Sequence, residues 1–169
     1  SAGCKQSIYN LCEAVLDKDD EVLIPSPYWV SYPEIVKLSD ASPVFIDTNS
    51  STDFKITGEM LTKSITNKTK MILLNSPSNP SGFIYNEKDL RDIGLVLKKH
   101  PNLIIASDDI YEHIIFDNKK FTNILNVCPE LYEQTIVLNG VSKAYAMTGW
   151  RIGYAAGPKD IIKAIRKVQ

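Results

Sequence analysis

The sequence has 169 residues and a mass of 18.9 kDa, enough for one domain with a full hydrophobic core. It holds 19 lysines and arginines and 20 aspartates and glutamates, and a net charge of −1 argues against binding nucleic acid or membrane surfaces through bulk charge. No apolar run approaches the ~18 residues of a membrane-spanning helix. The three cysteines and two histidines lack the spacing of a zinc site, and such cysteines are typical of a reducing, cytoplasmic compartment.

Both ends of the sequence indicate a segment of a longer protein. The chain begins with Ser1 and runs directly into a helical pattern, and residues 163–169 form a helical pattern without a stop signal. A trimmed protein with similar native ends is the alternative.

Predicted helices and strands alternate along the chain. In order, they are a helix over 6–16, a strand over 21–25, a helix over 28–38, a strand over 43–47, a helix over 58–66, a strand over 70–75, a helix over 86–100, strands over 103–106, 135–138 and 151–156, and a helix from Pro158. Apolar strands alternating with helices predict a three-layer α/β/α fold whose mostly parallel sheet is covered on both faces. Ligands of such sheets bind beyond the carboxyl ends of the strands.

Candidate functional groups follow four of these strands. They are Trp29 after the first strand, Asn75 and Asn79 after the third, Asp108, Asp109 and Tyr111 after the fourth, and Lys143 after the fifth. Taken singly, such residues are usually caps, turn formers, core aromatics or solvated lysines. Together they offer an imine-forming amine, a carboxylate for a pyridine nitrogen, partners for a ring hydroxyl and a cover for a ring face.

A phosphate site completes this set. The predicted helix N-terminus after Gly3 offers backbone N–H groups to an anion, and Arg151 offers a fixed positive charge. These groups match the needs of pyridoxal 5'-phosphate. Residue chemistry alone does not separate Asp108 from Asp109.

Five motifs stand in the order and spacing of a known family. They are SAGCKQ at 1–6, SPYWVSYP at 26–33, NSPSNPSG at 75–82, DDIYE at 108–112 and SKAYAMTGWRIG at 142–153. With these motifs, the sequence resembles the large, cofactor-binding domain of class I aminotransferases of the aspartate aminotransferase family. That family has fold type I, and the sequence is most similar to its bacterial aspartate and aspartate/prephenate branch. The resemblance covers residues 1–169 as a partial large domain without the small-domain segments.

The resemblance implies a role for each matching residue. It implies that Lys143 forms the Schiff base with pyridoxal phosphate, that Asp108 lies under the pyridine nitrogen and that Tyr111 bonds the ring hydroxyl; these three are the expected catalytic residues. The other implied cofactor-binding residues are Gly3, Cys4 and Lys5 in the phosphate loop, Trp29 stacked on the ring, Asn79 on the ring hydroxyl and Arg151 on the phosphate. Asn75 is the alternative to Asn79 for this role but is expected to be structural. Tyr28 is expected to contribute to packing rather than to bind the ring.

The implied activity is transfer of an amino group between an amino acid, expected to be aspartate, and a 2-oxo acid, expected to be 2-oxoglutarate. The resemblance also implies a homodimeric parent protein. Composition and charge add the expectation that the protein has no nucleic-acid, membrane or metal partner. Arg91 and Arg166 are expected at the surface, so the arginine that binds the substrate α-carboxylate is expected outside this sequence. The 169-residue chain alone is therefore expected to be inactive, and its sheet to lack one edge strand of the family.

Three other functions are compatible with the pattern. One is different chemistry on the same fold, such as a C–S lyase, and another is the aminotransferase-like ligand-sensing domain of a transcription regulator. The third is a structural domain without a ligand, which would require all five motifs to occur by chance.

Overall fold

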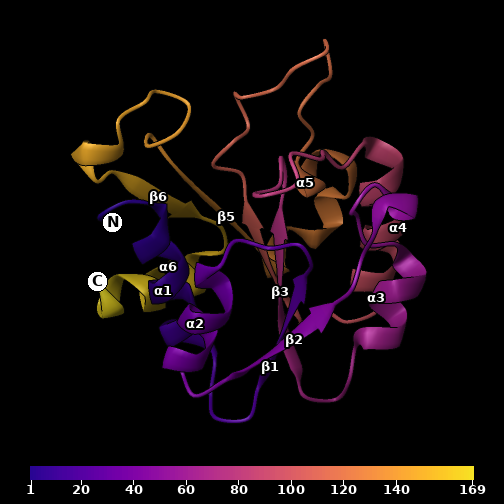
Figure 1. Ribbon diagram of the computed structural model, residues 1–169. Coiled ribbons are helices and arrows are strands. Elements are labelled where there is room, and N and C mark those ends of the chain that lie inside the picture. The colour runs from indigo at the N-terminus through magenta and orange to yellow at the C-terminus, as the bar shows by residue number, and fades with distance from the viewer.

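A six-stranded sheet lies between two layers of helices in the computed structural model, which describes residues 1–169 (Figure 1). The strands are β1 (Glu21–Pro25), β2 (Ser42–Ile46), β3 (Thr69–Asn75), β4 (Ile104–Asp108), β5 (Thr135–Gly140) and β6 (Gly153–Ala156). The helices are α1 (Cys4–Val15), α2 (Ser31–Leu38), α3 (Gly58–Ser64), α4 (Glu87–Leu97), α5 (Ile124–Val127) and α6 (Lys159–Val168). Short 3-10 turns span Ser50–Thr52, Pro129–Gln134 and Thr148–Trp150. The predicted three-layer α/β/α fold is confirmed.

The strand order in the sheet is β2-β1-β3-β4-β5-β6. Strands β1 to β5 pair in parallel, and β6 pairs antiparallel with β5 at the edge, where Ala2 also bridges Ile152. The carboxyl ends of β1, β3, β4 and β5 therefore meet at one edge of the sheet. The register places Asn75 beside Asp108, which brings two of the candidate strand ends together.

Each face of the sheet has its own hydrophobic core, because successive side chains on a strand point to opposite faces. Val22 and Ile24 of β1 pack into the core under α1, α2 and α6, whereas Leu23 packs into the core under α3, α4 and α5. Figure 1 shows these two groups of helices on opposite sides of the sheet. Burial of each such large aliphatic side chain stabilises the fold by roughly 1.5–3 kcal/mol.

Several element boundaries differ from the prediction. Helix α2 begins at Ser31 rather than at 28, because the preceding segment runs beside β2: the Ser26 N–H donates to the Ile46 carbonyl at 2.9 Å, and the Tyr28 ring stacks on Phe45 at 4.8 Å. Strand β4 runs two residues beyond the predicted end, to Asp108. Helix α5 and the 3-10 turns were not predicted.

None of the helices is both long and apolar enough to cross a membrane. The three cysteines are free thiols in the interior, and no cluster of metal-ligating side chains is present.

Candidate active site

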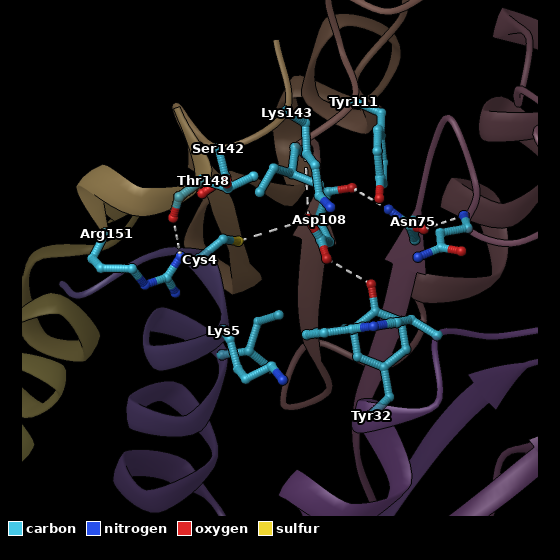
Figure 2. Close-up of a pocket in the computed structure, with 14 residues that line it drawn as sticks. Cys4, Lys5, Tyr32, Asn75, Asp108, Tyr111, Ser142, Lys143, Thr148 and Arg151 are labelled. Atoms are coloured by element: carbon cyan, nitrogen blue, oxygen red, sulfur yellow. Dashed lines mark hydrogen bonds between the residues drawn. The ribbon is translucent and has the colours of Figure 1, made fainter. Parts of the chain in front are cut away.

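A cavity of about 260 Å³ opens at the carboxyl edge of the sheet (Figure 2). It is lined by Cys4, Lys5, Ile8, Trp29, Tyr32, Asn75, Asn79, Asp108, Ile110, Tyr111, Ser142, Lys143, Thr148 and Arg151. Every predicted site residue except Gly3 is in this lining, and Gly3 lies directly against the Arg151 guanidinium. The fold thus brings together groups that are up to 147 residues apart in the sequence, from Cys4 to Arg151.

The Asp108 carboxylate is the buried anion of the cavity. As the last residue of β4 it is only 4% exposed, and burial raises its pKa. Three donors oppose that rise: the Tyr32 hydroxyl at 2.6 Å from Oδ2, the Ile110 N–H at 3.3 Å from Oδ1, and the more distant Cys4 thiol at 3.8 Å from Oδ1. A buried carboxylate that faces a cavity is suited to hold a positively charged donor such as a protonated ring nitrogen.

Asp109 is buried to the same extent but lies outside the cavity lining. Its Oδ1 accepts a hydrogen bond from the Ser107 hydroxyl at 2.8 Å, and its Oδ2 accepts one from the Asn123 side-chain amide. Burial raises the pKa of Asp109 to about 7. Residue chemistry could not choose between the two carboxylates, but their positions differ. Asp108 faces the cavity, whereas Asp109 links β4 to the start of α5.

The two asparagines also occupy different positions in the hydrogen-bond network. The Asn75 amide donates to the Asp108 carbonyl at 2.9 Å, and its Oδ1 accepts from the Asn79 backbone N–H at 2.8 Å. Asn75 therefore holds the loop that carries Asn79. The Asn79 side chain makes no hydrogen bond within the chain and lines the cavity, where it is free to bond a ligand.

Lys143 and Tyr111 face each other across one part of the cavity. The Lys143 ammonium lies 5.7 Å from the centroid of the Tyr111 ring, and Figure 2 shows both side chains above Asp108. Lys143 follows β5, and Tyr111 follows β4 by three residues. The amine, the phenol and the carboxylate are therefore held by neighbouring strands.

The start of α1 and the Arg151 guanidinium line the opposite part of the cavity. Helix α1 starts at Cys4, and the first-turn N–H groups of a helix lack intrahelical acceptors. Gly3 precedes it with a φ of +83°, a conformation that favours glycine, and a Cβ there would lie 2.4 Å from the Arg151 guanidinium. Arg151 is fixed by donating to the Thr148 carbonyl at 2.8 Å and the Ala2 carbonyl at 3.1 Å. Such a helix terminus and cation can hold a phosphate group.

Lys5 and Trp29 contact each other at the rim. The Lys5 ammonium lies 4.8 Å from the centroid of the Trp29 ring, within the range of a cation–π interaction. Trp29 itself packs edge-on against Tyr32, with ring centroids 5.4 Å apart and an interplanar angle of 87°. With Lys143 and Arg151, Lys5 gives the cavity three cations, which favours anionic ligands.

The donor set fits pyridoxal phosphate. The residues that would hold it are Asp108 at the ring nitrogen, Tyr111 and Asn79 at the ring hydroxyl, Trp29 at the ring face, Lys143 at the aldehyde, and Gly3, Cys4, Lys5 and Arg151 around the phosphate. These individual assignments stay predictions. Sequence analysis gave no role to five lining residues, which are Ile8, Tyr32, Ile110, Ser142 and Thr148. Tyr32 falls within the SPYWVSYP motif at the start of α2, but its residue type predicts packing and gave no sign of a role in the site.

Comparison with known proteins identifies the family. Residues 1–169 match the model of the family described as aminotransferase class I and II. The chain is 56% identical over 169 residues to an aspartate/prephenate aminotransferase of Nitrosomonas europaea, and 51% identical over 163 residues to an aspartate aminotransferase of Geobacillus stearothermophilus. These alignments cover 100% and 96% of the chain but 43% and 41% of the relatives.

Solved structures agree with the sequence relatives. An aspartate aminotransferase from Rhizobium meliloti superposes with a TM-score of 0.98 at 48% identity, covering 99% of this chain and 42% of that one. An aspartate aminotransferase from Thermus thermophilus with maleate superposes with a TM-score of 0.92 at 42% identity, covering 99% and 43%. The chain thus spans less than half the length of the curated relatives it matches, and it belongs to the class I and II aminotransferase family.

Proposed function

We propose that the protein is a pyridoxal-phosphate-dependent aminotransferase that moves an amino group between aspartate and 2-oxoglutarate. Support comes from relatives named aspartate aminotransferase at 50–51% identity, from one named aspartate/prephenate aminotransferase at 56%, and from the cavity at the carboxyl edge of the sheet. We also propose that the whole protein is a cytoplasmic homodimer. Its buried free thiols are those expected in a reducing compartment.

One observation carries the proposal. Lys143 and Asp108 line the same cavity, together with Tyr111, Asn79 and Arg151. A ligand-free structural domain has no need of a buried carboxylate that faces an open cavity lined by cations, and burying that carboxylate costs free energy.

When bound, pyridoxal phosphate supplies an aldehyde that bonds to amines and a ring that accepts the electron pair of the substrate α-carbon. Lys143 would bond to this aldehyde and, once displaced by the substrate amine, would carry the proton from the substrate α-carbon to the C4′ carbon of the cofactor. Asp108 keeps a proton on the ring nitrogen, because its charge stabilises the protonated form. Tyr111 and Asn79 donate to the ring hydroxyl oxygen, and Arg151 and the start of α1 hold the phosphate.

The substrate carboxylates need cations beyond the phosphate site. Arg151 is the one arginine in the cavity lining, whereas Arg91 on α4 and Arg166 on α6 are exposed elsewhere. We therefore propose that the arginine for the substrate α-carboxylate lies outside these 169 residues. The expected inactivity of the chain alone stays a prediction.

Borohydride reduction of the full-length protein loaded with pyridoxal phosphate tests the proposal. Reduction should fix the cofactor on the peptide that contains Lys143, and digestion with mass spectrometry locates it. A Lys143→Arg protein should take no label, whereas Lys5→Arg, the matched change at the other lining lysine, should keep it. Labelling of Lys5 instead, or no transamination by the full-length wild type, would contradict the proposal.

A further inference from the structure

Helices α1 and α2 and the β4 loop hold both oxygens of the Asp108 carboxylate. Oδ2 accepts from the Tyr32 hydroxyl at 2.6 Å, and Oδ1 accepts from the Ile110 N–H at 3.3 Å, with the Cys4 thiol at 3.8 Å (Figure 2). The Tyr32 bond is the shortest of the three and the only one to Oδ2. It therefore decides how the carboxylate is turned about its Cβ–Cγ bond.

Tyr32 is built to make this one contact. The residue is 3% exposed, its ring packs edge-on against Trp29, and its hydroxyl makes no other hydrogen bond. Burial and the neighbouring Asp108 raise the pKa of Tyr32 well above its usual value, so the hydroxyl stays protonated. A protonated phenol with a single partner acts as a donor over the whole working pH range.

Keeping Asp108 ionised costs free energy, because its carboxylate has almost no contact with water. A hydrogen bond to a charged group contributes more than one between neutral groups, and leaving a buried acceptor unpaired is unfavourable. Without the Tyr32 hydroxyl, the buried carboxyl would ionise less readily and its Oδ2 would lose its partner. A neutral Asp108 could no longer favour a proton on a nearby ring nitrogen.

We propose that Tyr32 is a positioning residue of the active site, whose hydroxyl orients the Asp108 carboxylate and stabilises its charged form. The inference rests on the proposed function and adds to it a residue to which sequence analysis gave no role. The other ionisable groups near this carboxyl are Cys4 on α1, Asp109 next in the chain, and Tyr111 beyond it. Cys4 has a raised pKa from burial and so adds no negative charge, and Asp109 is bonded to Ser107 and Asn123 instead.

The test compares Tyr32→Phe with Tyr28→Phe in the full-length protein loaded with pyridoxal phosphate. Both changes remove one phenolic oxygen and keep the ring, but Tyr28 stacks on Phe45 outside the cavity lining. The readout is the pH midpoint at which the absorption band of the lysine-bound cofactor shifts. Positive charge on the ring nitrogen repels a proton on the nitrogen that joins Lys143 to the cofactor. Losing part of that charge should raise the midpoint.

We expect Tyr32→Phe to raise this midpoint by about one pH unit and to lower kcat about tenfold, as loss of a charged hydrogen bond implies. Tyr28→Phe should leave both unchanged. In an Asp108→Asn background, removing the Tyr32 hydroxyl should move the midpoint much less, because residues that act through one another are not additive. Thermal melting verifies that each variant is folded.

Two results would overturn the inference. One is a wild-type midpoint in a folded Tyr32→Phe protein, and the other is an equal shift in the wild-type and Asp108→Asn backgrounds. Failure of the proposed function gives a different result: the wild-type protein itself would show no lysine-bound cofactor band and no transamination.

Discussion

The substitutions Asp108→Asn and Asp109→Asn each replace a carboxylate by its amide. They distinguish a residue that lines the cavity from a neighbour that stabilises the fold. Both residues are 4% exposed, yet only Asp108 lines the cavity. The two substitutions are equal in size and change the same chemical group, so they are matched controls for one another. The structure predicts opposite profiles of activity and stability.

For Asp108→Asn the expected loss is in turnover. A hydrogen bond to a charged partner contributes roughly 1.5–3 kcal/mol, which corresponds to about 10- to 150-fold in rate if it acts fully in the transition state. The amide also cannot supply the charge that keeps a ring nitrogen protonated. We expect kcat of the full-length, cofactor-loaded variant to fall at least tenfold.

For Asp109→Asn the expected loss is in stability. Both oxygens of Asp109 accept hydrogen bonds, from Ser107 and from Asn123, but an amide offers one acceptor and turns a donor toward another donor. An unpaired buried group of this kind costs about 1–3 kcal/mol. The melting temperature should therefore fall, while kcat per folded molecule stays close to wild type.

The stability deficit of Asp109→Asn should also depend on pH. Burial raises the pKa of Asp109 to about 7, above the ~3.9 of an unfolded chain. Between pH values of about 4 and 7, Asp109 is therefore protonated in the folded wild type but ionised in the unfolded chain. The free energy of unfolding of the wild type falls as pH rises through this range. The deficit should be largest at the acidic end of this window and smallest above pH 7.

Equal losses of kcat at both positions would refute the separation of roles.

Two further predictions concern the two ends of the cavity. A Cβ at Gly153 would lie 2.3 Å from the Gly3 carbonyl carbon and 2.4 Å from the Cys4 nitrogen, so Gly153→Ala should weaken pyridoxal phosphate binding. A Cβ at Gly149 would meet nothing within 4 Å, so Gly149→Ala should leave binding unchanged. Titration with the cofactor, followed by absorbance, compares the two variants. Asn79→Ala should lower kcat with little change in melting temperature, whereas Asn75→Ala should lower the melting temperature, because it removes two hydrogen bonds within the fold. The reverse pattern in either pair would contradict the assignment.

Sequence analysis predicted the fold closely because local and tertiary signals agree. Asn86 is an example: its side chain accepts from the Asp89 N–H in a capping box, as the residue types at the start of α4 indicate. The start of α2 was missed because a contact distant in sequence, Tyr28 on Phe45, decides it. The antiparallel direction of β6 depends on its pairing with β5, which no single-strand pattern encodes.

The cavity residues were predicted through strand ends and family motifs, but their mutual contacts were not. The Tyr32 hydroxyl and the Asp108 carboxylate are 76 residues apart in the sequence, and Cys4 and Asp108 are 104 apart. Neither pair has a spacing rule, since the pairs meet only after α1 and α2 pack on one face of the sheet. Residue type alone assigns Tyr32 to packing, and its burial agrees; only the single hydrogen bond of its hydroxyl reveals a further role.

The cavity is built from two structural parts, and this division has a consequence for how substitutions should act. The start of α1, Gly153 of β6 and Arg151 form the anion end, where backbone groups approach so closely that glycine is required. The ends of β3 and β4, with α2 behind them, form the carboxylate end, where Asp108 is oriented. Under the proposed function, the first part holds the cofactor and the second governs its proton. The two parts share no hydrogen bond except the distant Cys4 contact with Asp108. Substitutions at the anion end should therefore lower the affinity for the cofactor. Substitutions at the carboxylate end should instead alter the absorption spectrum and turnover at full cofactor occupancy.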